Sequence, residues 1–167
     1  RAILRADDKL SSSCTIITDK DDNQITAYHV GAGAEAKKVT VEGCAEKFDL
    51  GIIAPADKEA MVLHAEQLSQ AGIPFIFDPG QQLPLFSGDE LLALISKATI
   101  FIGNDYEMKL AENKTGKTPR QLLDYCERII VTLGEKGSII YTSTEELTIK
   151  PCSVQTIVDP TGAGDAY

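Results

Sequence analysis

The residues best suited to chemistry stand together at the end of the sequence, in Asp159-Pro160-Thr161-Gly162-Ala163-Gly164-Asp165-Ala166-Tyr167. Gly162 and Gly164 let the backbone bring successive N–H groups close to a negatively charged oxygen, and a helix beginning there adds its positive end. Asp165 follows on the first turn and can accept a proton from a hydroxyl group beside that loop. The same run is also typical of an ordinary turn before a helix, and the glycines alone favour neither interpretation.

Three motifs occur in an order that decides between these interpretations. The nonapeptide resembles the Asp-Thr-x-Gly-Ala-Gly-Asp signature of the ribokinase/PfkB family of carbohydrate and nucleoside kinases, with Asp159-Pro160-Thr161 in place of Asp-Thr-x. Val131-Thr132-Leu133-Gly134-Glu135-Lys136-Gly137 is similar to the family's Val-Thr-x-Gly-x-x-Gly, and Asn104-Asp105-Tyr106-Glu107 to its Asn-x-x-Glu. Together the motifs are far more specific than any one alone, so the chain is identified as a member of this family.

The resemblance implies that the terminal motif performs phosphoryl transfer. Asp165 is then the base that activates the accepting hydroxyl, and the amides of Gly162, Ala163 and Gly164 form an anion hole for the transferred phosphate. In relatives the first acid of the signature and the residue two positions later help to hold a monovalent cation, so the resemblance predicts that role, with K⁺, for Asp159 and Thr161. Asp159 has the alternative role of capping the terminal loop.

The two upstream motifs bind the nucleotide in relatives. The resemblance places Thr132, Gly134 and Gly137 along the phosphates of ATP. It also implies that Asn104 contacts the triphosphate and that Glu107 binds Mg²⁺ through water. Asn104 and Glu107 also have the spacing of a helix N-cap pair, and the two glycines flank a tight connection between two β runs. The position of Asn104 after a strand, where open α/β sheets bind ligands, favours the functional interpretation.

The charge and composition of the 167 residues exclude several other functions. Sixteen Lys and Arg against 25 Asp and Glu give a net charge of −9, which argues against a nucleic-acid-binding face and against anionic membranes, while leaving room for a local cationic spot. No long uncharged apolar run is present. Four widely spaced cysteines without a Cys-x-x-Cys pair predict free buried thiols in a reducing, cytoplasmic compartment.

The two ends predict that the sequence is an internal fragment of a longer protein. It opens on Arg1 without an initiator Met or a signal peptide. Family members are about twice as long, carry an N-terminal Gly-Gly segment that binds the acceptor, and continue past the catalytic Asp to build the adenine pocket. We therefore expect residues 1–167 alone to be inactive.

The hydrophobic pattern predicts an α/β fold with a mostly parallel sheet flanked by helices, and a hairpin near the N-terminus. The resemblance implies that this is the ribokinase-like (Rossmann-like) fold and that the hairpin is its β-lid. Residues 1–40 are assigned to the lid and its return to the main sheet, and residues 41–167 to the central part of the kinase domain. The predicted strands cover residues 12–18, 24–30, 49–54, 73–78, 99–103, 129–133, 138–142 and 147–150. The predicted helices cover 56–71, 87–97 and 118–127, the last with Pro119 at its first position.

The acceptor is predicted from the lid and from one strand end. Residues 22–32 and 78–82 resemble bacterial and archaeal adenosine or nucleoside kinases more than ribokinase, so an adenosine-like nucleoside is the first choice. Tyr28 and His29 suit a nucleobase, although alternation along a strand lets only one of them face the pocket. A sugar kinase acting on ribose or fructose is the second hypothesis, and a non-catalytic sugar- or nucleotide-binding regulator the third. A homodimer formed through the lid is expected as well.

A competing motif is weak by comparison. Gly31-Ala32-Gly33-Ala34-Glu35-Ala36 fits the loose Gly-x-Gly-x-x-Ala pattern of dinucleotide binders. It follows a polar strand, however. A ribose-binding acid should also stand at the end of the next strand, whereas Asp49 stands at its start. We therefore do not assign a dinucleotide site to it.

Overall fold

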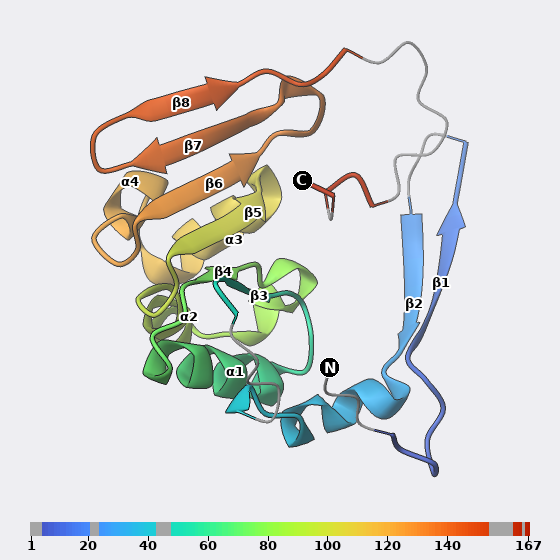
Figure 1. The fold of residues 1–167 in the computed structure, drawn as a ribbon. Coiled ribbons are helices and arrows are strands. Elements are labelled where there is room, and N and C mark those ends of the chain that lie inside the picture. Colours follow the sequence, from blue (N-terminus) through green and yellow to red (C-terminus); the bar gives the residue numbers. More distant parts are fainter. Residues whose placement is uncertain (1–4, 21–23, 43–47, 154–161, 165) are drawn as a thin grey trace.

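A computed structural model describes residues 5–20, 24–42, 48–153, 162–164 and 166–167 of the chain. They form a six-stranded sheet with helices and a separate two-stranded hairpin (Figure 1). The strands are β1 Ser13–Thr18, β2 Gln24–His29, β3 Gly51–Ile53, β4 Phe75–Phe77, β5 Ile100–Asn104, β6 Arg128–Thr132, β7 Ser138–Thr142 and β8 Glu146–Ile149. The α-helices are α1 Lys58–Gln70, α2 Gly88–Ile95, α3 Asp105–Thr115 and α4 Pro119–Leu122, and the 3-10 helices are η1 Gly31–Lys38, η3 Gly80–Leu85 and η4 Gly134–Lys136.

The large sheet has the strand order β3-β4-β5-β6-β7-β8. Its first four strands are parallel, and β7 and β8 add to it as antiparallel strands. Each parallel strand lies beside the one before it and is reached through a helix, so right-handed crossovers bring α1, α2 and α3 to the same face. The predicted mostly parallel α/β sheet and the hairpin are both confirmed.

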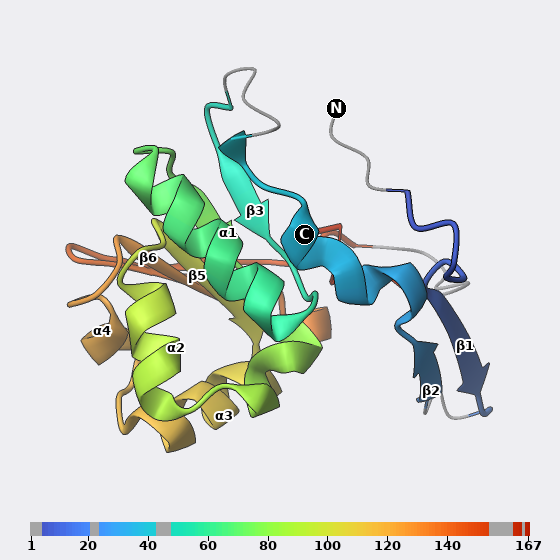
Figure 2. The same cartoon turned by 90° about the horizontal axis from the view of Figure 1, so that it is seen from below.

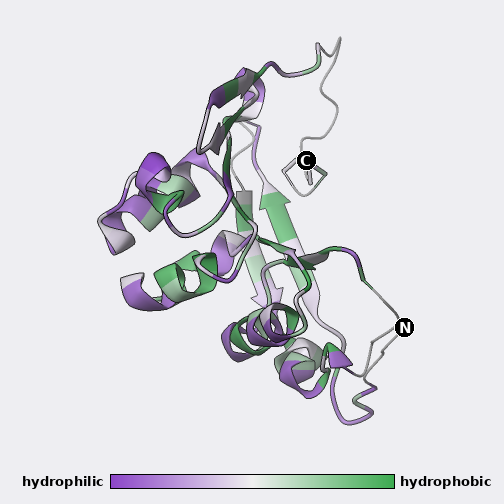
Figure 3. Ribbon diagram, turned by 60° about the vertical axis from the view of Figure 1, so that its left-hand side comes forward, coloured by the Kyte–Doolittle hydropathy of each residue, from purple (hydrophilic) through white to green (hydrophobic). Residues whose placement is uncertain are grey.

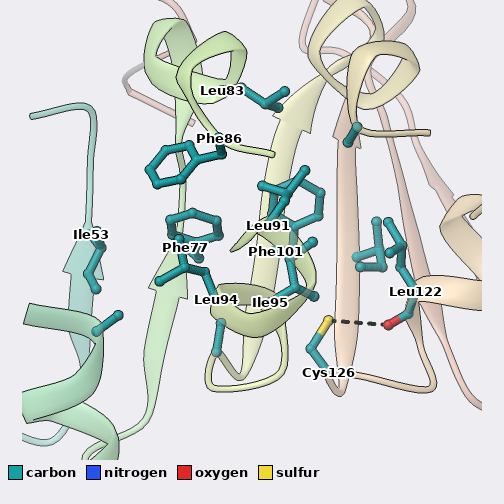
Figure 4. Close-up of a cluster of buried hydrophobic side chains, with 14 of the residues drawn as sticks. Ile53, Phe77, Leu83, Phe86, Leu91, Leu94, Ile95, Phe101, Leu122 and Cys126 are labelled. Atoms are coloured by element: carbon teal, nitrogen blue, oxygen red, sulfur yellow. Dashed lines mark hydrogen bonds between the residues drawn. The ribbon is translucent and has the colours of Figure 1, made fainter. Parts of the chain in front are cut away.

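Burial alternates along the parallel strands because one face carries the core. Phe75, Phe77, Phe101 and Ile129 are fully buried in a cluster that also contains side chains of all four α-helices. Phe77 stands at its centre, stacked on Phe101 with ring centroids 5.9 Å apart (Figure 4). Each α-helix carries hydrophobic and hydrophilic residues, as packing on one face of a sheet requires (Figure 3). None of the described helices is both long and apolar enough to cross a membrane.

The helix ends follow the capping signals of the sequence. Ser87, Asn104 and Thr118 each open a helix with a reciprocal capping box, and Gly116 ends α3 in the left-handed conformation. The α4 helix is shorter than predicted and ends at Leu122. It ends early because residues 123–125 make i→i−3 backbone hydrogen bonds, which belong to a tighter turn than an α-helix. The N–H of Glu127 then donates to the carbonyl of Thr99, just before β5, so the chain has already left the helix.

The β1–β2 hairpin is an arm outside the core, and all six residues of β1 are exposed. Contacts at its base hold it: Ala32 N donates to Leu10 O at 2.8 Å, and Lys9 forms an ion pair with Glu35. Hydrogen bonds from Lys38 and Lys9 lower the pKa of Glu35 to about 2. The η1 helix, which contains Glu35, lies between the hairpin and α1 (Figure 2). The division of the chain between residues 40 and 41 stays a prediction.

Candidate active site

Strand register brings the two upstream motifs together at one edge of the sheet. Asn104 is the last residue of β5 and pairs with Thr132, the last residue of β6. Thr132 pairs in turn with Ser138 at the start of β7, and Ser138 with Ile149 at the end of β8. We call these four residues the edge row. It runs along the carboxyl ends of the parallel strands, where open α/β sheets bind their ligands.

Asn104 and Glu107 form the helix cap that their spacing allows. The Asn104 side chain accepts a hydrogen bond from Glu107 N at 2.8 Å, and the Glu107 carboxylate accepts one from Asn104 N, also at 2.8 Å. The cap fixes a half-buried carboxylate at the carboxyl end of β5, where Gly103 has no side chain to displace it. Capping and ligand binding are therefore compatible here, because the cap holds the acid at the edge row.

The connection between β6 and β7 is the tight turn that its glycines predict. Gly134 and Gly137 have φ angles of +58° and +89°, and Leu133 N donates to Gly137 O at 2.8 Å. A Cβ on Gly137 would stand 2.0 Å from Ile149 O, so only glycine fits this contact between η4 and the end of β8. The turn leaves residues 134–136 exposed beside Thr132.

The terminal motif reaches the same edge through its last residue. Ala166 N donates to Gly162 O at 3.0 Å and Tyr167 N to Gly164 O at 3.2 Å, so the glycine-rich run begins a helical turn. Residues 162–164 and 166–167 are exposed, and Gly162 has a φ of +78°. The Tyr167 phenol oxygen lies 2.6 Å from Ser138 Oγ, which joins the turn to the edge row.

Three of the predicted site residues, Asp159, Thr161 and Asp165, lie outside the described residues. The other predicted residues of the phosphate site divide between the edge row with its adjoining turns and the terminal turn. Figure 1 shows the terminal turn, marked C, on the side of the sheet toward which the arrows of β5 and β6 point.

The predicted acceptor residues lie elsewhere, on strand β2 of the hairpin. Tyr28 and His29 are both exposed, and as neighbours in a strand they point to opposite faces. Tyr28 leans toward η1, since its hydroxyl would lie 3.6 Å from a Cβ placed on Gly33. The structure thus places the two kinds of predicted residue on different parts of the molecule.

Sequence reasoning missed four residues at this edge. Ser138 and Tyr167 are partners that only the strand register reveals. Lys136 in η4 and Lys150 after β8 are exposed and stand next in sequence to Gly137 and Ile149, which are in contact, so two lysines join the acids of this edge. Lys136 stands inside the Gly134–Gly137 motif, so the sequence could have indicated it as a candidate. Nothing in the sequence indicates that Lys150 lies near that motif.

Two other features that can mark a site are a metal cluster and a surface depression. The described residues contain no group of three or more His, Cys, Asp or Glu side chains placed to hold a metal. A single carboxylate such as Glu107 suits Mg²⁺, which is usually held by one or two carboxylates and substrate phosphates. An apolar depression of about 480 Å³ lies at the open edge strand β3, and no predicted site residue lines it.

Comparison with known proteins decides the family. The model of the pfkB family carbohydrate kinases matches residues 1–167. The chain belongs to this family. It is 34% identical to a nucleoside kinase of Methanocaldococcus jannaschii over 152 residues, which are 91% of this chain and 49% of that protein.

Solved structures of this family have the same fold. The structure of Burkholderia thailandensis nucleoside kinase in complex with inosine is 42% identical and superposes with a TM-score of 0.90, covering 95% of this chain and 52% of that one. The same enzyme in complex with ADP-inosine gives a TM-score of 0.88 at 42% identity, covering 95% and 50%. The chain spans about half the length of the curated relatives that it matches.

Proposed function

We propose that the protein is an ATP-dependent nucleoside kinase, which transfers the γ-phosphoryl group of ATP to a hydroxyl of a nucleoside such as adenosine or inosine. The similarity that carries this proposal is the 42% identity to a nucleoside kinase whose structure contains inosine. The three motifs support it, because two meet in the edge row and the third contacts that row through Tyr167.

The edge row and its turns would bind the triphosphate. Asn104, Thr132 and the exposed turn of residues 134–136 offer polar groups side by side at the carboxyl edge. Glu107 would hold Mg²⁺ through water, and the ion would neutralise charge on the phosphate oxygens. As a helix cap, residue 107 needs only an oxygen that accepts the hydrogen bond from Asn104 N, and a glutamine provides one. As a magnesium site it needs the negative charge, so Glu107→Gln separates capping from metal binding.

The terminal motif would perform the transfer. The amides of Gly162, Ala163 and Gly164 would stabilise the charge on the phosphoryl group in flight, and Asp165 would accept the proton of the attacking hydroxyl. The oxygen–phosphorus bond to the acceptor forms as the bond to the leaving ADP breaks, in line. Asp159 and Thr161 would hold K⁺, which adds positive charge near the anion hole.

The hairpin would cover the acceptor and present an aromatic ring to its base. Tyr28 and His29 point to opposite faces of β2, so a single ring would stack on the nucleobase. The hairpin also exposes Ile17 by 65% and Ile25 by 72%. An isolated two-stranded hairpin is marginally stable in water, and we propose that a second copy of the protein covers it in a homodimer.

An acceptor screen tests the proposal. The full-length protein would be assayed with Mg²⁺ and ATP against adenosine, inosine, guanosine, cytidine, ribose and fructose. Stacking contributes roughly 0.5–1.5 kcal/mol, so nucleosides should exceed free sugars in kcat/KM by a few-fold to about tenfold from this term alone. A preference for ribose or fructose would replace the nucleoside by a sugar. Binding of an acceptor without any phosphorylation would instead favour a regulator.

A further inference from the structure

A single buried hydroxyl connects the terminal turn to the sheet. Ser138 is the one fully buried polar residue in the part of the chain that the structure describes, and its Oγ lies 2.6 Å from the Tyr167 phenol oxygen. A buried hydroxyl without a partner is costly, so native structures almost always supply one. Tyr167 supplies it here across 29 positions of sequence.

The serine side of this bond is rigid. Ser138 opens β7 and is held by strand pairing on both sides, with Thr132 on one side and Ile149 on the other. Its hydroxyl is therefore a fixed point in the edge row. Ser138 pairs with Thr132, the predicted nucleotide contact. A group that bonds to the Ser138 hydroxyl is therefore held at a nearly fixed distance from Thr132.

The tyrosine side is continuous with the glycine-rich turn. Tyr167 N donates to Gly164 O and Ala166 N to Gly162 O, so two backbone hydrogen bonds tie Tyr167 and its neighbour to the glycines. Tyr167 is 55% exposed in the part of the chain that the structure describes, and its phenol oxygen reaches the buried Ser138 hydroxyl. The phenol bond therefore joins this turn directly to a residue of the sheet.

We propose that Tyr167 is a positioning residue for phosphoryl transfer: its bond to Ser138 holds the Gly162–Gly164 amides at a set place beside the edge row. This inference rests on the proposed kinase function. Preorganised amides stabilise transferred charge only when they stand at the right distance, and displacements near 1 Å reduce rates by up to about a hundredfold. Substrate binding by the edge row itself does not depend on this bond.

The test uses Tyr167→Phe and Ser138→Ala in the full-length kinase. Each should lower kcat about tenfold and leave the KM values for ATP and nucleoside within about twofold, because the bond acts on the transfer step. The double variant should be no slower than Tyr167→Phe alone, since both changes remove the same bond. Tyr141→Phe is the matched control, a phenol loss further along the same strand β7, and should keep the wild-type kcat.

Two results would overturn the proposal while leaving the kinase function intact. One is a Tyr167→Phe enzyme with wild-type kcat. The other is a fall in kcat that disappears after correction for the folded fraction, measured by thermal unfolding, because that would make the bond merely structural. A wild-type protein that phosphorylates none of the acceptors would instead refute the proposed function and this inference with it.

Discussion

The hairpin and the carboxyl edge of the sheet carry the two sets of predicted ligand residues and are built in opposite ways. The hairpin has two exposed strands and is attached at its base, where Lys9 pairs with Glu35. The edge row ends strands whose inner residues, among them Phe101 and Ile129, are fully buried. This difference fits the proposed roles, because a triphosphate site gains from rigid walls, whereas an arm that covers an acceptor has to admit and release it.

The largest expected effect concerns the terminal motif. Asp165→Asn should lower kcat of the full-length enzyme by about 10²–10⁴-fold, because a general base contributes that much, while ATP binding stays close to wild type. Steady-state kinetics and nucleotide titration measure the two quantities. Near-normal turnover would remove Asp165 from the mechanism and leave the edge row as a binding site only.

Stability should differ sharply between the two regions. Phe101→Ala should lower the free energy of unfolding by about 3–5 kcal/mol, because Phe101 is fully buried and stacked on Phe77. At a protein concentration low enough to keep the protein monomeric, Ile25→Ala in the hairpin should change the free energy of unfolding by no more than about 0.5 kcal/mol, since Ile25 is 72% exposed within a single copy. Urea unfolding of both variants provides the comparison. A large loss for Ile25→Ala would show that another part of the protein covers the hairpin.

The reactivity of two thiols compares the buried core with the exposed hairpin without a substitution in the core. Burial raises the pKa of the Cys126 thiol to about 11 from an ordinary 9.0, so the thiolate fraction at pH 8 falls about a hundredfold. Cys14 on the hairpin is exposed. In a Cys44→Ser/Cys152→Ser background, a thiol reagent should label Cys14 at once and Cys126 only after unfolding. Rapid labelling of Cys126 in folded protein would contradict the buried position.

A smaller effect tests the capping box at the edge row. Glu107→Gln keeps an acceptor for Asn104 N and removes the charge, so stability should hold while the Mg²⁺ concentration for half-maximal activity rises by roughly three- to tenfold. Magnesium titrations at saturating ATP measure the shift. The matched control is Glu90→Gln, the same exchange in the capping box of α2. An unchanged magnesium titration for Glu107→Gln would make Glu107 a helix cap and nothing more.

The sequence predicted local structure well because its signals are local. The capping residues Ser87 and Thr118 each open a helix where predicted, and β7 has the predicted bounds. The helix α3 was not among the predicted helices, although the cap spacing of Asn104 and Glu107 was recognised as an alternative to a ligand role. The end of α4 was missed because it depends on where the chain joins β6, a tertiary constraint.

The candidate site was predictable only as separate motifs. Short spacings and a family resemblance indicate the residues, but strand order decides which of them meet. The edge row needs the pairing of β5, β6, β7 and β8, which no spacing reveals. For the same reason the bond between Ser138 and Tyr167 had no signal in the sequence.

The most direct test of the account is whether the two regions serve different substrates. Thr132→Val at the edge row should raise the KM for ATP by a few-fold, the loss expected for one hydrogen bond, and leave the KM for the nucleoside unchanged. Tyr28→Ala together with His29→Ala on the hairpin should do the reverse, because the stacking surface for the base is lost. Both KM values would be measured for both variants in the full-length enzyme. The account predicts that the two effects separate in this way. Equal increases of both KM values in each variant, or the opposite assignment, would contradict it.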